Sequence, residues 1–196
     1  MAATGHPGDV LDEPGVEAII GSIVGAHGHL DILVNSAGVA ALGPALDLAL
    51  DEWRQGLRVN LEGTFICCRA AARVMLPRGS GKIINISSVR GLQGRSGYSS
   101  YAPSKAGVNL LTRSLACEWS AQGICVNAIA PTFIRTEMNA RIVDDPEQRR
   151  AIEARIPMGR LGQVPDLFGA AVFLASAASD FITGTVLYVD GGWTAA

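Results

Sequence analysis

Hydrophobic positions along the chain alternate between two spacings. Stretches with apolar residues three or four apart, the spacing of one helix face, are each followed by a short run that is apolar at nearly every position. The predicted helix and strand pairs span residues 16–28 and 31–35, 51–76 and 82–86, 99–122 and 124–130, and 166–178 and 185–190. Strands this hydrophobic are typical of a parallel sheet covered on both faces. The pattern therefore predicts one doubly wound α/β domain over residues 1–196, with an irregular polar segment at 131–165.

The third predicted helix carries suitable residues at both ends. Ser99 or Ser100 is available as its N-cap, and Pro103 is tolerated because it falls in the first turn. Gly123 stands just beyond the predicted end, where a glycine ends many helices.

Composition and charge narrow the class of protein. A chain of 196 residues with 48% apolar and 17% charged residues suits a well-buried domain and excludes disorder. Sixteen basic and eighteen acidic residues without a basic patch exclude nucleic acid as an expected partner. The longest uncharged apolar run, at 167–179, is shorter than the roughly 20 residues that span a bilayer, and residues 1–10 hold no signal core. We therefore expect a soluble, cytoplasmic protein that binds no membrane.

The cysteines give no sign of a metal or redox site. Cys67, Cys68, Cys117 and Cys125 form no C-x-x-C pair and no Cys/His cluster. We expect each to be a reduced thiol that behaves as a small buried hydrophobe, and we expect no metal site.

Polar residues follow the predicted strands, where ligands of a doubly wound sheet bind. Residues 35–38, 87–88 and 131–136 come directly after strands, and Tyr101 and Lys105 lie at the start of the helix after the second of these segments. Tyr101 and Lys105 are four apart and share a helix face, so the ammonium is expected to lower the pKa of the phenol from about 10. Tyr101 is therefore a candidate acid or base. Lysine is rare in this sequence, since Lys105 is one of only two lysines in the chain.

The order and spacing of these residues resemble the short-chain dehydrogenase/reductase family, of the classical type, over essentially the whole chain. Ser88 stands thirteen residues before Tyr101, and Lys105 follows Tyr101 by four. The other matching positions are Asp9-Val10, Asn35-Ser36-Ala37-Gly38, Asn60, Pro131 to Thr136 and Asp190-Gly191-Gly192. The resemblance implies a Rossmann-like fold and an oxidoreductase that uses NAD or NADP to interconvert a secondary alcohol and a ketone.

The resemblance also assigns roles to individual residues. Tyr101 is implied to give or take the proton, and Ser88 to hold the substrate oxygen. Lys105 is implied to lower the pKa of the tyrosine and to bind the nicotinamide ribose, with Asn60 supporting a water relay to it. The implied cofactor contacts are Asp9 and Val10 to adenine, Asn35, Ala37 and Gly38 beside the adenosine half, and Pro131, Ile134 and Thr136 at the carboxamide.

The sequence departs from the family pattern at three places. Ser36 replaces a second asparagine, and Thr132 replaces a glycine whose backbone is freer. The glycine-rich turn with which the family begins is not found ahead of Asp9, so roughly 50 residues, about one βαβ unit and more, are missing from the pattern. We therefore expect an N-terminally shortened member in which the strand at 31–35 is a sheet edge. Either the working enzyme starts earlier, or the short chain has weak or no activity.

The substrate is only faintly indicated. The segments at 89–98 and 137–157 should border the pocket, which makes Gln93, Tyr98 and Met138 candidate substrate contacts beside Ser88. The turn from Pro131 to Thr136 resembles that of some sugar and polyol dehydrogenases of the family. The general layout resembles oxoacyl-thioester reductases as well, and this alternative stays open.

A further hypothesis is a catalytically inactive subunit that acts in oligomerisation. Family members usually form tetramers through two long helices, which correspond to residues 51–76 and 99–122 here. The resemblance therefore implies a homo-oligomer, a dimer or a tetramer, and leaves open co-assembly with a longer relative.

Overall fold

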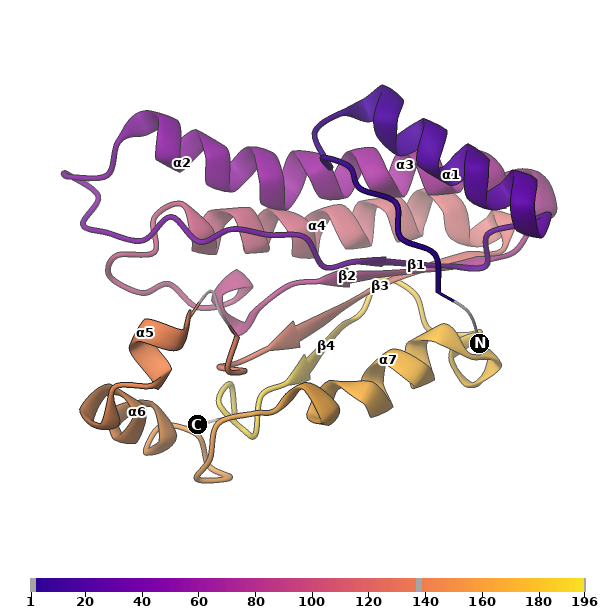
Figure 1. Cartoon of the computed structure of the whole chain (residues 1–196). Helices are drawn as coiled ribbons and strands as arrows, with labels where there is room; N and C mark the ends of the chain where they lie inside the picture. The colour runs from indigo at the N-terminus through magenta and orange to yellow at the C-terminus, as the bar shows by residue number, and fades with distance from the viewer. Residues whose placement is uncertain (1–2, 137–138, 196) are drawn as a thin grey trace.

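A four-stranded parallel sheet runs through the protein, as a computed structural model describes it for residues 3–136 and 139–195. Its order is β1-β2-β3-β4. The strands are β1 (Ile32–Asn35), β2 (Gly81–Ile86), β3 (Ile124–Pro131) and β4 (Val186–Val189). Helices α1, α3 and α4 lie on one side of the sheet and α7 on the other (Figure 1). The predicted α/β, Rossmann-like architecture is confirmed.

The helices connect successive strands, as parallel pairing requires. The α-helices are α1 (Glu13–His27), α2 (Leu50–Leu57), α3 (Gly63–Met75), α4 (Tyr101–Trp119), α5 (Ala140–Val143), α6 (Pro146–Glu153) and α7 (Phe168–Ala175). A π-helical turn, η1 (Arg58–Glu62), joins α2 to α3. The 3₁₀ turns are η2 (Leu76–Arg78), η3 (Val89–Gly91), η4 (Ser120–Gln122), η6 (Val164–Leu167) and η7 (Ala177–Ser179).

Three predictions about the helices need correction. The helix predicted over 51–76 is interrupted by η1, because apolar periodicity does not show a change of hydrogen-bond register. Ser100 precedes α4 but its hydroxyl donates to the carbonyl of Trp53 (3.0 Å), so it does not cap the helix. The segment at 131–165 is not wholly irregular: Asp145 caps α6 through the backbone N–H groups of residues 147 and 148.

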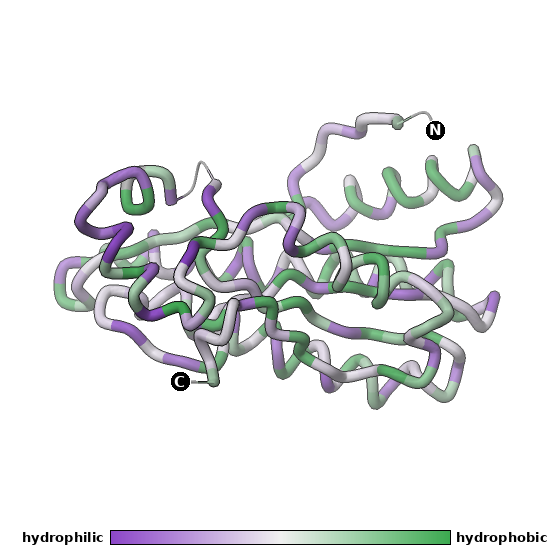
Figure 2. The backbone as a smooth tube through the Cα atoms, turned by 90° about the horizontal axis from the view of Figure 1, so that it is seen from below, coloured by the Kyte–Doolittle hydropathy of each residue, from purple (hydrophilic) through white to green (hydrophobic). Residues whose placement is uncertain are grey.

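The main core lies between the sheet and the layer of α1, α3 and α4. Buried side chains of this core include Ile83 and Val126 from the sheet and Met75 from α3. A second core, with Leu174 of α7 and Ile129 of β3, fills the opposite side. The tube in Figure 2 shows hydrophobic segments that recur along α1 with paler segments between them, in line with its burying Val16 and Ile20.

Strand β1 is the exception to coverage on both faces. Among the described strands it pairs with β2 alone, so it is an edge, as predicted. Leu33 packs into the main core, whereas Ile32 and Val34 are 41% and 50% exposed. The prediction of strands covered on both faces is therefore wrong for β1, since α1 and α3 cover only the face that Leu33 occupies.

The structure also tests the expected burial of the cysteines and gives findings on metal ligands and on membrane-spanning helices. Cys68 is buried, but Cys117 is exposed, so the prediction that every cysteine is a buried hydrophobe is wrong for that residue, which lies on the outer side of α4. Within residues 3–136 and 139–195, no three Cys, His, Asp or Glu side chains gather as metal ligands. In the same part of the chain, no helix combines the length and the hydrophobicity needed to cross a bilayer.

Candidate active site

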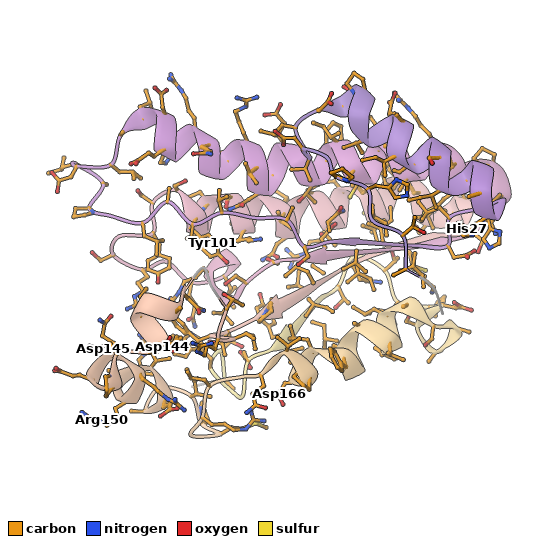
Figure 3. The ribbon with its side chains drawn as sticks, viewed as in Figure 1. His27, Tyr101, Asp144, Asp145, Arg150 and Asp166 are labelled. Carbon is orange, nitrogen blue, oxygen red and sulfur yellow. The ribbon has the colours of Figure 1, made fainter. Side chains whose placement is uncertain are left out.

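Ser88 and Tyr101 meet at one cavity of about 90 Å³, at the carboxyl end of the sheet. Ser88 follows β2 and caps η3, where its hydroxyl accepts from the backbone N–H of Arg90 (3.1 Å). Tyr101 is the first residue of α4, and Figure 3 shows it between the start of that helix and α5. The two residues that the sequence singled out as hydrogen-bond donor and acid/base are therefore neighbours.

The phenol of Tyr101 is held in its protonated form. Burial raises its pKa above the ordinary value, and this effect outweighs the hydrogen bond with Ser88 and the charge of Arg90, which both lower the pKa. The sequence predicted a pKa lowered by Lys105. That direction is wrong for the protein without a ligand, because desolvation of the phenolate dominates.

Lys105 lies behind the tyrosine on α4. Its Nζ atom is 5.8 Å from the centre of the Tyr101 ring and donates to the carbonyl of Ile86 at the end of β2 (2.8 Å). The side chain is 6% exposed, and burial lowers the pKa of its ammonium to about 8. Lys105 is thus still charged at neutral pH, in a place where charge is unfavourable.

Asn60 is fully buried in the π-helical turn η1 and uses its whole carboxamide. Its Oδ1 accepts from the N–H of Val39 (2.8 Å), while its Nδ2 donates to the Val39 carbonyl (2.9 Å) and to the hydroxyl of Ser104 (2.9 Å). Ser104, which the sequence reasoning missed, donates in turn to the carbonyl of Tyr101 (2.7 Å). Asn60 therefore fastens the loop after β1 to α4, and its water relay stays a prediction.

A second buried pair locks the loop after β2 onto α4. The Ser87 hydroxyl lies 2.5 Å from Oδ1 of Asn109 and donates to the Lys105 carbonyl (3.3 Å). Gly91 permits this approach, since a Cβ there would lie 2.8 Å from the Lys105 carbonyl oxygen. The sequence reasoning missed Asn109, although its place four residues after Lys105 puts it on the same helix face.

Some of the predicted cofactor residues near β1 line one cavity, and others lie outside it. Val10 and Ala37 line a cavity of about 180 Å³ at the end of β1, with Asn35. The Asn35 carboxamide itself points to its neighbour strand and donates to Asn85 Oδ1 (2.8 Å). Asp9 lies outside this cavity and is exposed, and its carboxylate accepts from the Leu11 N–H (2.9 Å).

The segment after β3 is fixed by Asn139. Its Nδ2 donates to the Ile134 carbonyl (2.7 Å), and its Oδ1 accepts from the Thr136 N–H (2.9 Å). Pro131 ends β3, and the hydroxyl of Thr132, in the place of the family glycine, is buried without a hydrogen-bond partner among the described residues. Thr132 lines the cavity that holds Ser88 and Tyr101.

The three substrate candidates fall in different places. Tyr98 lines the same cavity as Tyr101, with the two rings edge to face and their centres 6.2 Å apart. Gln93 lines a neighbouring cavity of about 690 Å³, where its Oε1 accepts from the indole N–H of Trp193 (2.9 Å). Met138 lies outside the described residues.

The residues around Lys105 suit the ribose of a nicotinamide nucleotide. A Cβ on Gly38 would lie 3.1 Å from Asn60 Oδ1 and 3.7 Å from Lys105 Nζ, so the backbone of residue 38 comes close to both groups with no side chain of its own in between. Within the described residues Lys105 donates one hydrogen bond to the carbonyl of Ile86, and an ammonium has three N–H groups. Two donors therefore remain for hydroxyl groups.

Comparisons with known proteins show a family match and several similar dehydrogenases. The model of the family described as enoyl-(acyl carrier protein) reductase matches residues 1–194. A 2-dehydro-3-deoxy-D-gluconate 5-dehydrogenase of Bacillus subtilis is 49% identical over 165 residues, with 84% of this chain and 65% of the relative covered. A D-threitol dehydrogenase of Mycolicibacterium smegmatis is 40% identical, over 98% of this chain and 74% of the relative.

A solved structure agrees with these relatives. The crystal structure of a gluconate 5-dehydrogenase from Burkholderia cenocepacia, in complex with NADP and tartrate, superposes with a TM-score of 0.94 at 44% sequence identity. The superposition covers 96% of this chain and 74% of that one. The chain thus spans about two thirds to three quarters of the length of these three proteins.

Proposed function

This chain belongs to the classical short-chain dehydrogenase/reductase family, and we propose that it is an NAD(P)-dependent oxidoreductase that interconverts a secondary alcohol and a ketone on a sugar or polyol. The observation that carries the proposal is the shared cavity of Ser88 and Tyr101, with Lys105 5.8 Å behind the tyrosine ring. The names of the relatives favour a sugar or polyol over an oxoacyl thioester.

The chemistry follows from what each side chain does. A bound nicotinamide would supply or accept the hydride. Ser88 donates a hydrogen bond to the substrate oxygen, on which negative charge develops during reduction. Tyr101 then delivers the proton, which its raised pKa keeps on the phenol at neutral pH.

Lys105 and the loop after β1 hold the nucleotide in this scheme. The ammonium of Lys105 is fixed by the Ile86 carbonyl and offers its other N–H groups to the ribose hydroxyls. Asn60 keeps residues 38 and 39 beside it. With its N–H groups hydrogen-bonded to Ile86 and to a bound ribose, the Lys105 ammonium would be less penalised by burial, and as a nearby positive charge it would favour the tyrosinate needed for alcohol oxidation.

We also propose how the chain assembles, where it works and what kind of substrate it takes. The chain works as one Rossmann-like domain that assembles with copies of itself through α2–α3 and α4, on which Phe65 and Leu110 are exposed. Its place of work is the cytoplasm, in line with its reduced thiols. Its substrate is a small alcohol or carbonyl compound.

Nucleotide titration tests the proposal first. Purified chain of checked oligomeric state is titrated with NADH and NADPH while the nicotinamide fluorescence is followed, and a panel of sugars, sugar acids, polyols and a 3-oxoacyl thioester is then assayed. We expect saturable binding of at least one nucleotide and turnover within the sugar and polyol set. A folded chain that binds neither nucleotide, or one that reduces only the thioester, would contradict it.

A further inference from the structure

Arg90 is a buried cation without an anionic partner in the part of the chain that the structure describes. It follows Ser88 by two residues, in η3, and is 5% exposed. Its Nε and Nη2 atoms are buried and have no hydrogen-bond partner within residues 3–136 and 139–195. A buried guanidinium ordinarily donates to a carboxylate or to carbonyl groups, because a buried charge without a partner is strongly unfavourable. Arg90 therefore has hydrogen-bond donors in place that no group of the described residues accepts.

Two aromatic rings lie against the Arg90 guanidinium, and a second guanidinium lies nearby. Its guanidinium carbon lies 5.4 Å from the centre of the Tyr98 ring and 5.3 Å from that of Trp193. Arg95 stacks on the same Tyr98 ring at 5.2 Å. Among the described residues, neither arginine lies within ion-pair distance of a carboxylate. Two positive charges thus share one tyrosine, and burial and the charge of Arg95 lower the pKa of Arg90.

These donors adjoin the reacting groups. Arg90, Arg95 and Tyr98 line the cavity of about 690 Å³ that contains Gln93. Tyr98 also lines the cavity of Ser88 and Tyr101, so the two cavities share a wall. The charge of Arg90 reaches Tyr101, whose pKa it lowers. A small molecule whose hydroxyl group binds Ser88 and Tyr101 can therefore extend toward the two guanidinium groups.

We propose that Arg90, with Arg95 beside it, binds a carboxylate of the substrate, so that the protein acts on sugar acids in preference to neutral sugars and polyols. The planar fork of a guanidinium matches a carboxylate with two parallel hydrogen bonds, which a hydroxyl group does not do. The inference rests on the proposed function and names its substrate class. The relatives do not decide this point, since their names include both a sugar-acid and a neutral polyol dehydrogenase.

The test compares two probes that differ at one carbon. D-gluconate and D-sorbitol have the same chain and stereochemistry, but D-gluconate has a carboxylate where D-sorbitol has a hydroxymethyl group. Ligand-detected NMR titrations of the full chain without nucleotide give the dissociation constants of both. We expect D-gluconate to bind at least tenfold more tightly, and Arg90→Met to abolish that preference while D-sorbitol binding changes less than threefold.

Arg155→Met is the matched control. The Arg155 guanidinium also stacks on Trp193, at 4.3 Å, but Arg155 is exposed and lines neither cavity. This variant should keep the preference for D-gluconate. Equal affinity of the wild-type chain for the two probes would overturn the inference, as would an equal loss of preference in the Arg90 and Arg155 variants.

Turnover separates this inference from the proposed function. A chain that prefers D-gluconate in the NMR titration but oxidises no alcohol with NAD or NADP supports the acid-binding site and contradicts the oxidoreductase. A chain that oxidises D-sorbitol and D-gluconate with the same kcat/KM supports the oxidoreductase and contradicts the acid-binding site. Arg90→Lys, which keeps the charge without the fork, should retain only part of the preference.

Discussion

Two adjoining parts of the candidate site differ in how their buried polar groups are paired. The part here called the site floor consists of Asn60, Ser87, Ser104, Lys105 and Asn109. The part called the site rim consists of Arg90, Arg95, Tyr98 and Trp193. Asn60 alone makes three hydrogen bonds within the chain, whereas Nε and Nη2 of Arg90, equally buried, have no partner among the described residues. Folding pairs the polar groups of the floor, except for two N–H groups that Lys105 keeps for a ribose, whereas a ligand is needed to pair Nε and Nη2 of Arg90.

This difference matches the two tasks of an enzyme. Catalytic groups work best when packing and hydrogen bonds hold them in place before the substrate arrives. Asn60 and Ser104 do this for Tyr101 and Lys105, since they join the loop after β1 to the first turn of α4. Specificity, in contrast, is provided by donors that are left unpaired when the wrong substrate binds. Nε and Nη2 of Arg90 are unpaired donors of this kind among the described residues.

The largest effect is expected at Tyr101, which lies between the two parts. Tyr101→Phe removes the proton donor and keeps the ring that packs against Tyr98. General acid or base groups contribute about 10²- to 10⁴-fold, so kcat should fall by about 10³-fold. Steady-state kinetics and the NADPH titration check this together, because nucleotide affinity should stay the same. A kcat of the variant within tenfold of the wild-type value would show that Tyr101 is not the proton donor.

Substitution in the floor should destabilise the protein. Asn60→Leu keeps the volume but leaves the backbone of Val39 and the hydroxyl of Ser104 without their partners. Each buried group left unsatisfied costs about 1–3 kcal/mol, so the free energy of unfolding should fall by about 3 kcal/mol. Urea unfolding followed by circular dichroism measures it. A loss under about 1 kcal/mol would mean that the floor is not held together by this residue.

The buried ammonium of Lys105 should make stability depend on pH. Its pKa of about 8 in the folded protein lies below the value of 10.5 for an unperturbed lysine, so the unfolded chain binds more protons between these values. Stability therefore rises with pH from about 8 to 10.5, and the unfavourable contribution is fully present below pH 8. From pH 7 to pH 10, wild type should gain about 2 kcal/mol relative to Lys105→Met.

Comparison with that variant cancels the other groups that titrate at alkaline pH. Burial raises the pKa of Cys68 to about 12 and raises the pKa of Tyr101, and both effects lower stability as the pH rises above their unfolded values. These groups are present in both proteins. Parallel stability curves for wild type and Lys105→Met would contradict a lowered pKa for Lys105.

Substitution in the rim should have the smallest effect on stability. Arg90→Met removes a buried charge that has no anionic partner within residues 3–136 and 139–195, and it loses the stacking on Tyr98 and Trp193. Apolar replacement of buried charges is often neutral or stabilising, so the free energy of unfolding should stay within about 1 kcal/mol of wild type or rise. The same urea unfolding as for Asn60→Leu provides the comparison. A loss as large as that of Asn60→Leu would show that the rim is also complete without a ligand.

Sequence reasoning reached the floor better than the rim. Asn60 and Lys105 of the floor, and Ser88 and Tyr101 beside it, could be predicted because their order and spacing in the chain match the family pattern. Ser104 could not, since its partner Asn60 is 44 positions away and meets it only through the packing of η1 on α4. For the rim, the sequence named the loop at 89–98 but not the burial of Arg90, which depends on Trp193 at the other end of the chain.

The errors about the fold have similar causes. Apolar spacing predicted every strand to within two residues, because buried strands are read directly from hydrophobic runs. It did not show the π-helical turn, whose register is set by hydrogen bonds, nor the raised pKa of Tyr101, which is set by burial from several segments. Local pattern thus defines elements, and tertiary packing defines the electrostatics of the site.

Hydride transfer itself is the most direct test of the account. A secondary alcohol of the sugar-acid class, deuterated at the carbinol carbon, is incubated with the chain and NAD or NADP, and the nucleotide is analysed by mass spectrometry. The account predicts reduced nucleotide that carries one deuterium with the wild-type chain and nearly none with Tyr101→Phe. A folded, nucleotide-binding chain that yields no deuterated nucleotide would contradict it.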